Sequence, residues 1–200
     1  YLRMTEAREV LRTLREHPDV FLRMVGFNRK CEVYGEWMRM MIYDKEDETI
    51  QASRGSGKTT CVSGALALLC ILYPNDKIAF FRKTDSDVKE VIAQVQKMLV
   101  HENTIALSRM IWGIPIELTS KTQSEVNTNL NNDPRGAAQL VGMGINGSIT
   151  GKHFDRIFTD DIVNLKDRLS KAERDRTKAV YYELHNILNP GGRIFNTGTP

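Results

Sequence analysis

A glycine-rich octapeptide constrains this chain more than any other feature. It follows a short β-prone run and precedes a long apolar run that Pro74 ends. Glycines let backbone N–H groups turn inward around an anion, and the first turn of a helix presents the positive end of its dipole. We therefore predict a strand, a phosphate-binding loop and a helix in that order, with Ala52 where such loops usually begin with glycine. The octapeptide is Ala52, Ser53, Arg54, Gly55, Ser56, Gly57, Lys58 and Thr59.

The side chains of this loop predict ATP and Mg²⁺ as cofactors. Lys58 is expected to contact the β- and γ-phosphates, and the Thr59 hydroxyl is expected to bind Mg²⁺. Arg54 is a candidate arginine finger acting in cis on the γ-phosphate, and the alternative is a surface arginine paired with an acid. The alternative for the whole loop is a chance glycine-rich turn. The expected nucleotide contacts are Ser53, Arg54, Gly55, Ser56, Gly57, Lys58, Thr59 and Thr60.

Two adjacent acids close a later apolar run at residues 156–159. An acid at the tip of a core strand beside a phosphate loop can bind Mg²⁺, so Asp160 is the predicted metal-side acid. Asp161 is the predicted catalytic acid that orients and deprotonates the attacking water, although translocating ATPases usually place the longer glutamate there. Taken alone, paired acids more often cap helices or occupy turns.

A third polar group follows the last predicted strand. Thr197, Gly198 and Thr199 should emerge at the same edge of the sheet as the loop, because open α/β sheets bind ligands at the carboxyl ends of their strands. We interpret them as a coupling segment that senses the γ-phosphate. By itself such a tripeptide is usually only a turn.

The order of apolar runs predicts an α/β domain at residues 46–200, preceded by a helical segment at residues 1–45 that packs on the core. In the preface, Thr5 should cap the first helix, and the third should bury Val33, Trp37, Met40 and Met41. The predicted strands are 49–52, 78–82, 114–119, 125–128, 139–141, 156–160 and 193–197. The predicted core helices are 58–73, one capped within 84–87 and running to 99, and one begun by a Ser170/Glu173 capping box and ended by residues 190–192.

The composition of the chain says more about its cellular compartment than about its binding partner. Apolar residues make up 41% of the chain and the net charge is +3, which permits nucleic-acid binding without arguing for it. Three cysteines without metal-ligand spacing favour a reducing, intracellular site. The longest apolar stretch, 61–73, is too short to span a bilayer, so we expect a cytosolic protein without a membrane partner.

With these motifs assembled, the chain resembles the ATPase domain of the large terminase subunit, the DNA-packaging motor of tailed bacteriophages. The resemblance covers roughly residues 20–200 and depends on segments 21–37, 51–60, 147–152, 154–161 and 196–200. It implies a P-loop NTPase of the ASCE/RecA-like type, with a mainly parallel sheet sandwiched by helices and an N-terminal helical preface. By this likeness Arg54 is the loop arginine, Asp160 the metal-side acid, Asp161 the catalytic acid, and 197–199 the coupling motif.

The same resemblance implies the partners. They are double-stranded DNA, a homo-oligomeric ring that is a pentamer on the portal, the portal protein and the small terminase subunit, in the cytoplasm of the infected host. Lys152 stands where the family commonly has a basic residue that reaches a neighbour's nucleotide, so it is the candidate trans-acting residue. The separate nuclease domain of the family should be absent from these residues.

Other functions stay open from the sequence alone. Another P-loop DNA-translocating ATPase or helicase, a P-loop kinase and a non-hydrolysing nucleotide-binding module all share the loop. A GTPase is a further rival because residues 164–167 superficially resemble a guanine-reading motif, with the lysine displaced by one position. The candidate DNA contacts are scattered basic residues: Arg82, Lys83, Lys121, Arg135 and Lys152.

Overall fold

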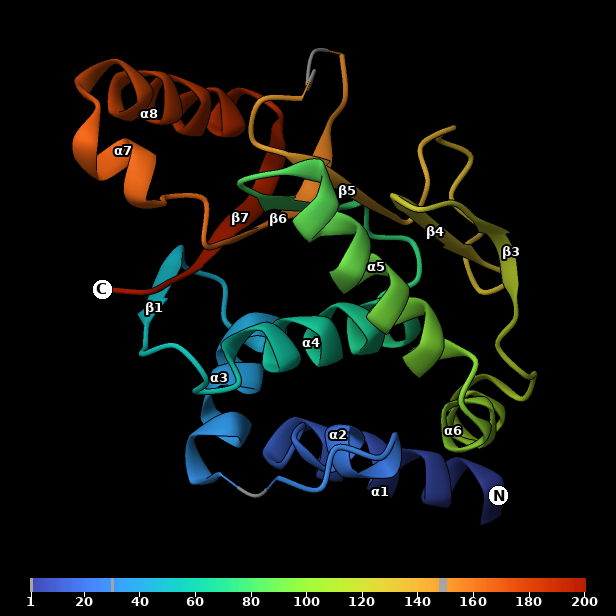
Figure 1. The fold of residues 1–200 in the computed structure, drawn as a ribbon. Coiled ribbons are helices and arrows are strands. Elements are labelled where there is room, and N and C mark those ends of the chain that lie inside the picture. Colours follow the sequence, from blue (N-terminus) through green and yellow to red (C-terminus); the bar gives the residue numbers. More distant parts are fainter. Residues whose placement is uncertain (1, 30, 148–150) are drawn as a thin grey trace.

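The computed structural model describes residues 2–29, 31–147 and 151–200 (Figure 1). Its helices are α1 (Leu2–Glu16), α2 (Val20–Met24), α3 (Glu32–Tyr43), α4 (Lys58–Leu72), α5 (Asp85–Leu99), α6 (Glu102–Trp112), α7 (Leu165–Leu169) and α8 (Lys171–Asn186). Its strands are β1 (Glu48–Gln51), β2 (Ile78–Arg82), β3 (Leu118–Lys121), β4 (Glu125–Thr128), β5 (Leu140–Gly144), β6 (Phe154–Asp160) and β7 (Leu188–Gly198).

The strands form one seven-stranded sheet in the order β1-β7-β6-β2-β5-β4-β3. The pairs that join β1, β7, β6, β2 and β5 are parallel, whereas β4 pairs antiparallel with both β5 and β3. The last strand in the chain therefore lies between the strand before the glycine loop and the strand that ends at the two acids. This order places the carboxyl ends of β1, β7 and β6 side by side.

Helices cover both faces of the sheet, which confirms the predicted α/β fold. Phe80 of β2 packs with α4 and α5 in one apolar cluster, while Phe81 packs with α8 residues such as Leu184 in the other. Adjacent residues of a strand point to opposite faces, so β2 contributes to both clusters. Figure 1 shows α4 and α5 on one side of the sheet and α8 on the other.

Helices α2 and α3 lie against α4 on the side away from the sheet, and α1 packs on α3 and α6 (Figure 1). Gly64 of α4 allows this close approach, because a Cβ there would meet Leu22 and Met38. The predicted buried stripe of α3 is confirmed at Met41 and otherwise lies one position away from the observed stripe. Its buried residues are Tyr34, Met38, Met41 and Ile42, whereas Val33 is exposed and Trp37 and Met40 are half-buried.

Several predicted boundaries also differ from the structure. Helix α1 begins at Leu2, so Thr5 lies inside it and does not cap it. Helix α6 was not predicted, and β3 begins at Leu118, four residues after the expected start of that strand. Residues 190–192 lie within β7, which begins directly after α8. The strand at 78–82 and the Thr84 cap of α5 agree with prediction.

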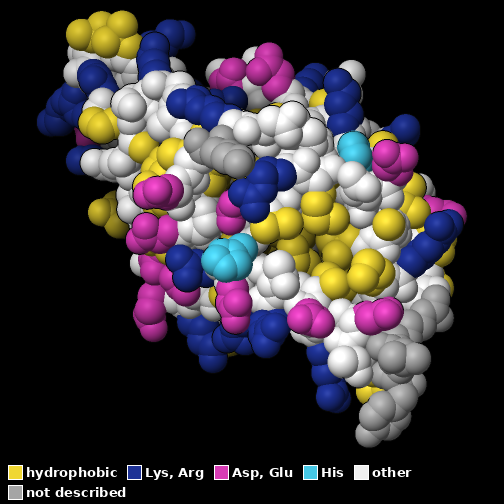
Figure 2. Space-filling view, turned by 90° about the horizontal axis from the view of Figure 1, so that it is seen from below, with side chains coloured by type: hydrophobic (Ala, Val, Ile, Leu, Met, Phe, Trp, Pro, Cys, Tyr) yellow, Lys and Arg dark blue, Asp and Glu magenta, His cyan; other side chains and the backbone are white. Residues whose placement is uncertain are grey.

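Among the described residues, none of the helices combines the length and the apolar composition needed to cross a bilayer. The face seen from the side of α1, α2 and α6 carries apolar side chains near its middle, with basic and acidic side chains interspersed around them (Figure 2). Neither sign of charge dominates that face.

Candidate nucleotide-binding site

The glycine loop has the backbone conformation that its sequence requires. Gly55 and Gly57 have φ values of +73° and +90°, in the region that side chains other than glycine rarely adopt, and Gly57 is the residue before the first turn of α4. Two residues of the preface hold the loop from outside. Arg29 donates to the Gly55 carbonyl at 2.7 Å, and the Tyr34 hydroxyl donates to the Ser56 carbonyl at 2.9 Å.

Lys58 lies at the centre of the site with only 5% of its surface exposed. Its ammonium group donates to the Ala52 carbonyl at 2.7 Å and to the Thr199 hydroxyl at 3.2 Å. Because Thr199 follows β7, the loop lysine and the predicted coupling segment are in direct contact across 141 positions of sequence. The ammonium group is thus held at the carboxyl end of the sheet.

Asp160 is fully buried at the end of β6 and is surrounded by donors. The Thr59 hydroxyl donates to Oδ2 at 2.9 Å, the Thr197 hydroxyl donates to Oδ1 at 2.7 Å, and Arg82 Nε lies 3.3 Å from Oδ2. Burial raises the pKa of Asp160, while the Thr197 hydroxyl and the Arg82 charge act in the opposite direction. The two predicted Mg²⁺ ligands, Thr59 and Asp160, therefore lie in contact.

Asp161 is the more exposed of the two acids, with 33% of its side chain accessible. Its φ of +47° is the only positive value among the described non-glycine residues, so its backbone is held in a strained turn. The backbone N–H and the hydroxyl of Thr199 both donate to Asp161 Oδ1, at 2.9 and 3.1 Å. The hydroxyl of Thr199 therefore accepts from Lys58 and donates to Asp161.

These groups border a cavity of about 540 Å³ at the mouth of the loop. Its lining includes four cationic side chains and one carboxylate. The buried hydroxyl of Ser56, which also lines the cavity, has no hydrogen-bond partner among the residues that the structure describes. A polyanion with hydrogen-bond acceptors fits such a lining, so the residues present fit a nucleotide triphosphate. The cavity is lined by Arg29, Arg54, Gly55, Ser56, Gly57, Lys58, Thr59, Thr60, Arg82, Asp161 and Thr199.

The structure brings most of the predicted site residues together. Ser53 contributes a carbonyl that accepts from Lys58 at 3.4 Å, and the Gly198 carbonyl accepts from Ala52 N–H at 3.1 Å. Lys152 is not part of the cavity. It precedes the amino end of β6, whereas Asp160 ends that strand. Of the segment 147–152 that contributed to the family resemblance, residues 148–150 lie outside the described residues.

Sequence reasoning missed three residues of the site: Arg29, Tyr34 and Arg82. Arg82 ends β2, the neighbour of β6, so the rule that located Asp160 at the carboxyl edge could also have found it. Arg82 and Lys83 were instead candidate DNA contacts, and both side chains are engaged with carboxylates inside the protein. Nothing local in the sequence distinguishes Arg29 or Tyr34.

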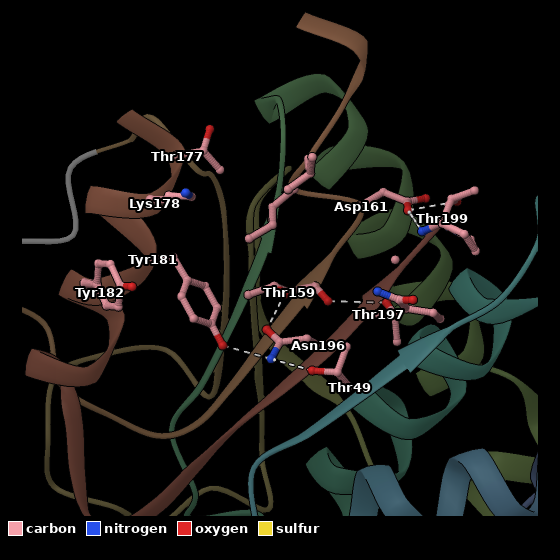
Figure 3. A pocket seen from close by; sticks show the side chains of 15 residues that line it. Thr49, Thr159, Asp161, Thr177, Lys178, Tyr181, Tyr182, Asn196, Thr197 and Thr199 are labelled. Carbon is pink, nitrogen blue, oxygen red and sulfur yellow. Dashed lines mark hydrogen bonds between the residues drawn. The ribbon is translucent and has the colours of Figure 1, made fainter. Parts of the chain in front are cut away.

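A second pocket of about 470 Å³ lies on the α8 face of the sheet, beside the same strand ends (Figure 3). Tyr181 points from α8 toward β7, and its hydroxyl accepts from Asn196 at 2.9 Å. Asn196 also donates to Thr49 at 3.3 Å and accepts from Thr159 at 2.7 Å. This chain of hydrogen bonds joins β1, β7 and β6 just below the acids.

Comparison with known proteins identifies the family. A protein-family model described as "Terminase large subunit, T4likevirus-type, N-terminal" matches residues 49–179. A search of curated proteins found no match to the chain. The match to the family model covers more than half of the chain.

Solved structures of phage large terminases are among those that match this chain. The HK97 bacteriophage large terminase matches with a TM-score of 0.52 and 15% identity, over 85% of this chain and 33% of that chain. The Thermus phage P74-26 large terminase ATPase domain matches over 90% and 68%, with a TM-score of 0.49 and 13% identity. The large terminase of the thermophilic bacteriophage D6E matches over 90% and 38%, with a TM-score of 0.45 and 14% identity.

The chain thus spans about a third of the length of the HK97 protein. The family resemblance inferred from the phosphate loop, the two acids and the coupling segment is confirmed by the family model, which spans the loop and both acids. This chain belongs to the T4likevirus-type terminase large subunit family, to the part that the family model describes as N-terminal.

Proposed function

We propose that this chain binds ATP with Mg²⁺ and hydrolyses it to drive translocation of double-stranded DNA during viral genome packaging. The observation that carries the proposal is the convergence of three distant segments on one cavity. Lys58 and Thr59 come from the loop, the acids from the end of β6, and Thr199 from the end of β7. In this arrangement the groups that would bind phosphate, hold the metal ion and activate water are adjacent.

The loop residues would bind the phosphates. The backbone amides of the loop and the cations Lys58 and Arg54 would hold the β- and γ-phosphates and offset the charge that grows during transfer. Thr59 and Asp160 would hold the metal ion, which when bound offsets phosphate charge and fixes the phosphate oxygens in place. Their oxygens are 2.9 Å apart, as two neighbouring ligands of one small cation would be.

Asp161 would orient the attacking water and accept its proton. One of its oxygens is held by Thr199, and the carboxylate faces the cavity that would receive the γ-phosphate. Thr199 also contacts Lys58, so loss of the γ-phosphate would change the partners of both Lys58 and Asp161. The segment 197–199 is placed to transmit that change along β7.

The alternative functions, a GTPase, a kinase and a non-hydrolysing nucleotide-binding module, can be distinguished from an ATPase. Residues 164–167 form a helix cap in which the Asp167 side chain accepts from Asn164 N–H, and Asp167 is buried against Lys83. That carboxylate is not free to recognise guanine, which disfavours a GTPase. A kinase would transfer phosphate to an acceptor, and a non-hydrolysing module would bind ATP without turnover, so phosphate release separates both from an ATPase.

The wider assembly is proposed on the family membership alone. Residues 1–45 would form a helical segment packed on an ATPase domain at 46–200. The chain would work in the host cytoplasm as a ring, a pentamer on the portal, with the portal protein and the small subunit as partners. Lys152 would act on the nucleotide of a neighbouring subunit.

The test is duplex-stimulated phosphate release from ATP by the wild type and by Asp161→Ala. We expect the variant to lose about 10²–10⁴-fold in rate, the usual contribution of a general base, while a fluorescent ATP analogue still binds. Lys58→Ala should lose the analogue as well. Hydrolysis by Asp161→Ala at the wild-type rate would show that the catalytic assignment is wrong.

A further inference from the structure

The net positive charge of this protein is concentrated in residues 165–178, which form α7 and the first half of α8. Residues 165–178 include six basic and three acidic residues, a net charge of +3 that equals the net charge of all 200 residues. The remaining residues are therefore balanced, in keeping with the mixed charges on the face of Figure 2. One of the three acids, Asp167, is buried and paired with Lys83 from outside the segment, so the exposed part of α7 and α8 is more basic still.

Four of these cations make no polar contact with the described part of the chain. Among the described residues, the side chains of Lys166, Lys171, Arg176 and Lys178 are exposed and form neither an ion pair nor a hydrogen bond. We call these four side chains the α7–α8 basic surface. The other two basic residues of the segment, Arg168 and Arg174, donate to main-chain carbonyls.

The position of Lys171 also argues for an external partner. It is the first residue of α8, where the helix dipole favours acids and disfavours cations by about 0.3–1 kcal/mol. Helix stability therefore does not account for a lysine here. An anion bound at this end would satisfy both the dipole and the side chain.

The spacing of the surface suits a nucleic-acid backbone. Lys171 and Lys178 are two turns apart on one face of α8, a separation of about 10 Å. One strand of a DNA duplex places about three phosphates along the same distance. The exposed Tyr182 continues the same face, and Asp175 lies between the two lysines. A protein partner with an acidic helix is the other macromolecule that such a stripe could meet, but the repeated charge of DNA matches it without requiring a particular sequence.

The basic surface is connected to the candidate site by two short routes. Helix α7 begins four residues after Asp161, and Val163, Leu165 and Arg168 line a cavity together with Arg82 and Asp161. Beside Arg82, the Lys83 ammonium group donates to Asp167 of α7 at 2.8 Å and to Thr177 of α8 at 3.0 Å. A force applied to α7 and α8 would therefore be transmitted to the segment that carries Asp160 and Asp161.

We propose that the α7–α8 basic surface binds the phosphate backbone of the DNA duplex that the ATPase moves. The inference rests on the proposed function, and it adds the surface that would transmit force from the nucleotide site to DNA. It assigns no base recognition, because the four side chains are long, exposed cations suited to phosphates.

Duplex binding across a salt series tests the proposal, with Lys171→Glu/Lys178→Glu compared with the wild type. Loss of two phosphate contacts should weaken binding at low salt by about tenfold or more and reduce the slope of log K against log salt by about 2. The matched control is Lys89→Glu/Lys97→Glu, which reverses two exposed lysines on α5, the helix that covers the opposite face of the sheet. Asp175→Asn should strengthen binding, because it removes the acid between the two lysines.

ATP hydrolysis measured without DNA separates the two proposals. We expect the double variant to keep this basal rate and to melt at or slightly above the wild-type temperature, because Glu suits the first turn of α8 better than Lys, while losing stimulation by the duplex. If the double variant hydrolyses ATP at the basal rate and also binds duplex with the wild-type affinity and salt slope, the proposed DNA-binding surface is wrong. The proposed function would not be affected by that result. A wild type that hydrolyses no ATP would refute the proposed function. Binding of the wild type to an acidic peptide but not to duplex would assign the surface to a protein partner and overturn the proposal.

Discussion

At the residue scale, the contact between Gly57 and Tyr34 determines the shape of the loop. Gly57 has φ +90°, and a Cβ at this position would overlap the Tyr34 hydroxyl, which donates to the neighbouring Ser56 carbonyl. Gly55 has φ +73° but no atom near the position of its Cβ. A side chain at Gly55 would therefore strain only the backbone, whereas a side chain at Gly57 would strain the backbone and also clash with Tyr34.

Gly57→Ala should lose ATP-analogue binding more severely than Gly55→Ala, because it adds a clash with Tyr34 to a strained φ that costs about 1–3 kcal/mol. Adding Tyr34→Phe should recover only a small part of the loss, since it removes the oxygen at 2.0 Å from the added Cβ but keeps the ring carbon Cζ at 2.6 Å. Analogue titration and thermal melting of the four variants, Tyr34→Phe alone included, would measure this. Equal losses for the two glycine variants would contradict the role of Tyr34.

Asp160 gives a prediction about pH. Burial raises the pKa of Asp160 in the folded chain above the ordinary value of about 3.9 for an aspartate. At neutral pH the buried carboxylate therefore destabilises the folded chain. This destabilisation disappears at a pH low enough to protonate Asp160 in both the folded and the unfolded chain. Asp160→Asn should therefore stabilise the chain at neutral pH and progressively less as pH falls toward that value. Urea unfolding across the pH range measures the difference, with the more exposed Asp161→Asn as control. A destabilised Asp160→Asn at neutral pH would contradict it.

At the element scale, a buried cluster fixes α7 and α8 to the sheet. Lys83, just beyond β2, contacts Asp167 and Thr177, and the Thr177 hydroxyl donates to Asp167 at 2.6 Å. The hydrogen bonds within the cluster lower the pKa of Asp167 despite its burial. A second buried lysine, Lys77, donates to the Ala137 carbonyl at 2.9 Å, and burial lowers its pKa.

Lys83→Met should destabilise the chain by about 3–5 kcal/mol, because it leaves Asp167 buried without its cation. Lys77→Met should cost much less, because the charge that it removes is disfavoured by its surroundings. Urea unfolding at neutral pH compares the two substitutions, of which Lys83→Met leaves a buried carboxylate behind and Lys77→Met leaves a backbone carbonyl. A similar cost for both would show that the ion pair does not hold α7 and α8 in place.

At the scale of the whole molecule, the preface supports both ends of the site. Arg29 and Tyr34 hold the glycine loop, and Arg193 of β7 donates to the Met40, Met41 and Glu46 carbonyls around the end of α3. Lys152 lies at the other end of β6 from the acids, so it cannot serve the nucleotide of its own subunit without spanning that strand. Any role for Lys152 in catalysis requires a second subunit.

Specific ATPase activity should therefore rise with protein concentration. Mixing Lys152→Ala with Asp161→Ala should give more activity than either variant alone, because one supplies an intact set of acids and the other an intact lysine. Steady-state phosphate release over a concentration series measures both effects. A rate per subunit that does not depend on concentration would assign the finger role to Arg54 in cis.

Local chemistry was readable from the sequence. The loop conformation follows from Gly55 and Gly57, α5 begins where Thr84 caps it, and β2 has the predicted bounds, because each depends on residues near it in the chain. Helix α6 was missed although Gly113, with φ +79° at its end, is a usual helix stop, since its cap is His101 and not a commoner capping residue.

Only the tertiary structure placed β7 between β1 and β6, and this order brings Thr197 to Asp160 and Thr199 to Lys58 and Asp161. It also enclosed Lys83 with Asp167 and set Arg29, Tyr34 and Arg82 around the loop. The sequence alone determined which groups could bind a phosphate or a metal ion, because that depends on side-chain chemistry and short spacing. Which groups meet depended on strand order, because sheet pairing joins segments about a hundred residues apart and leaves no local signal in either one.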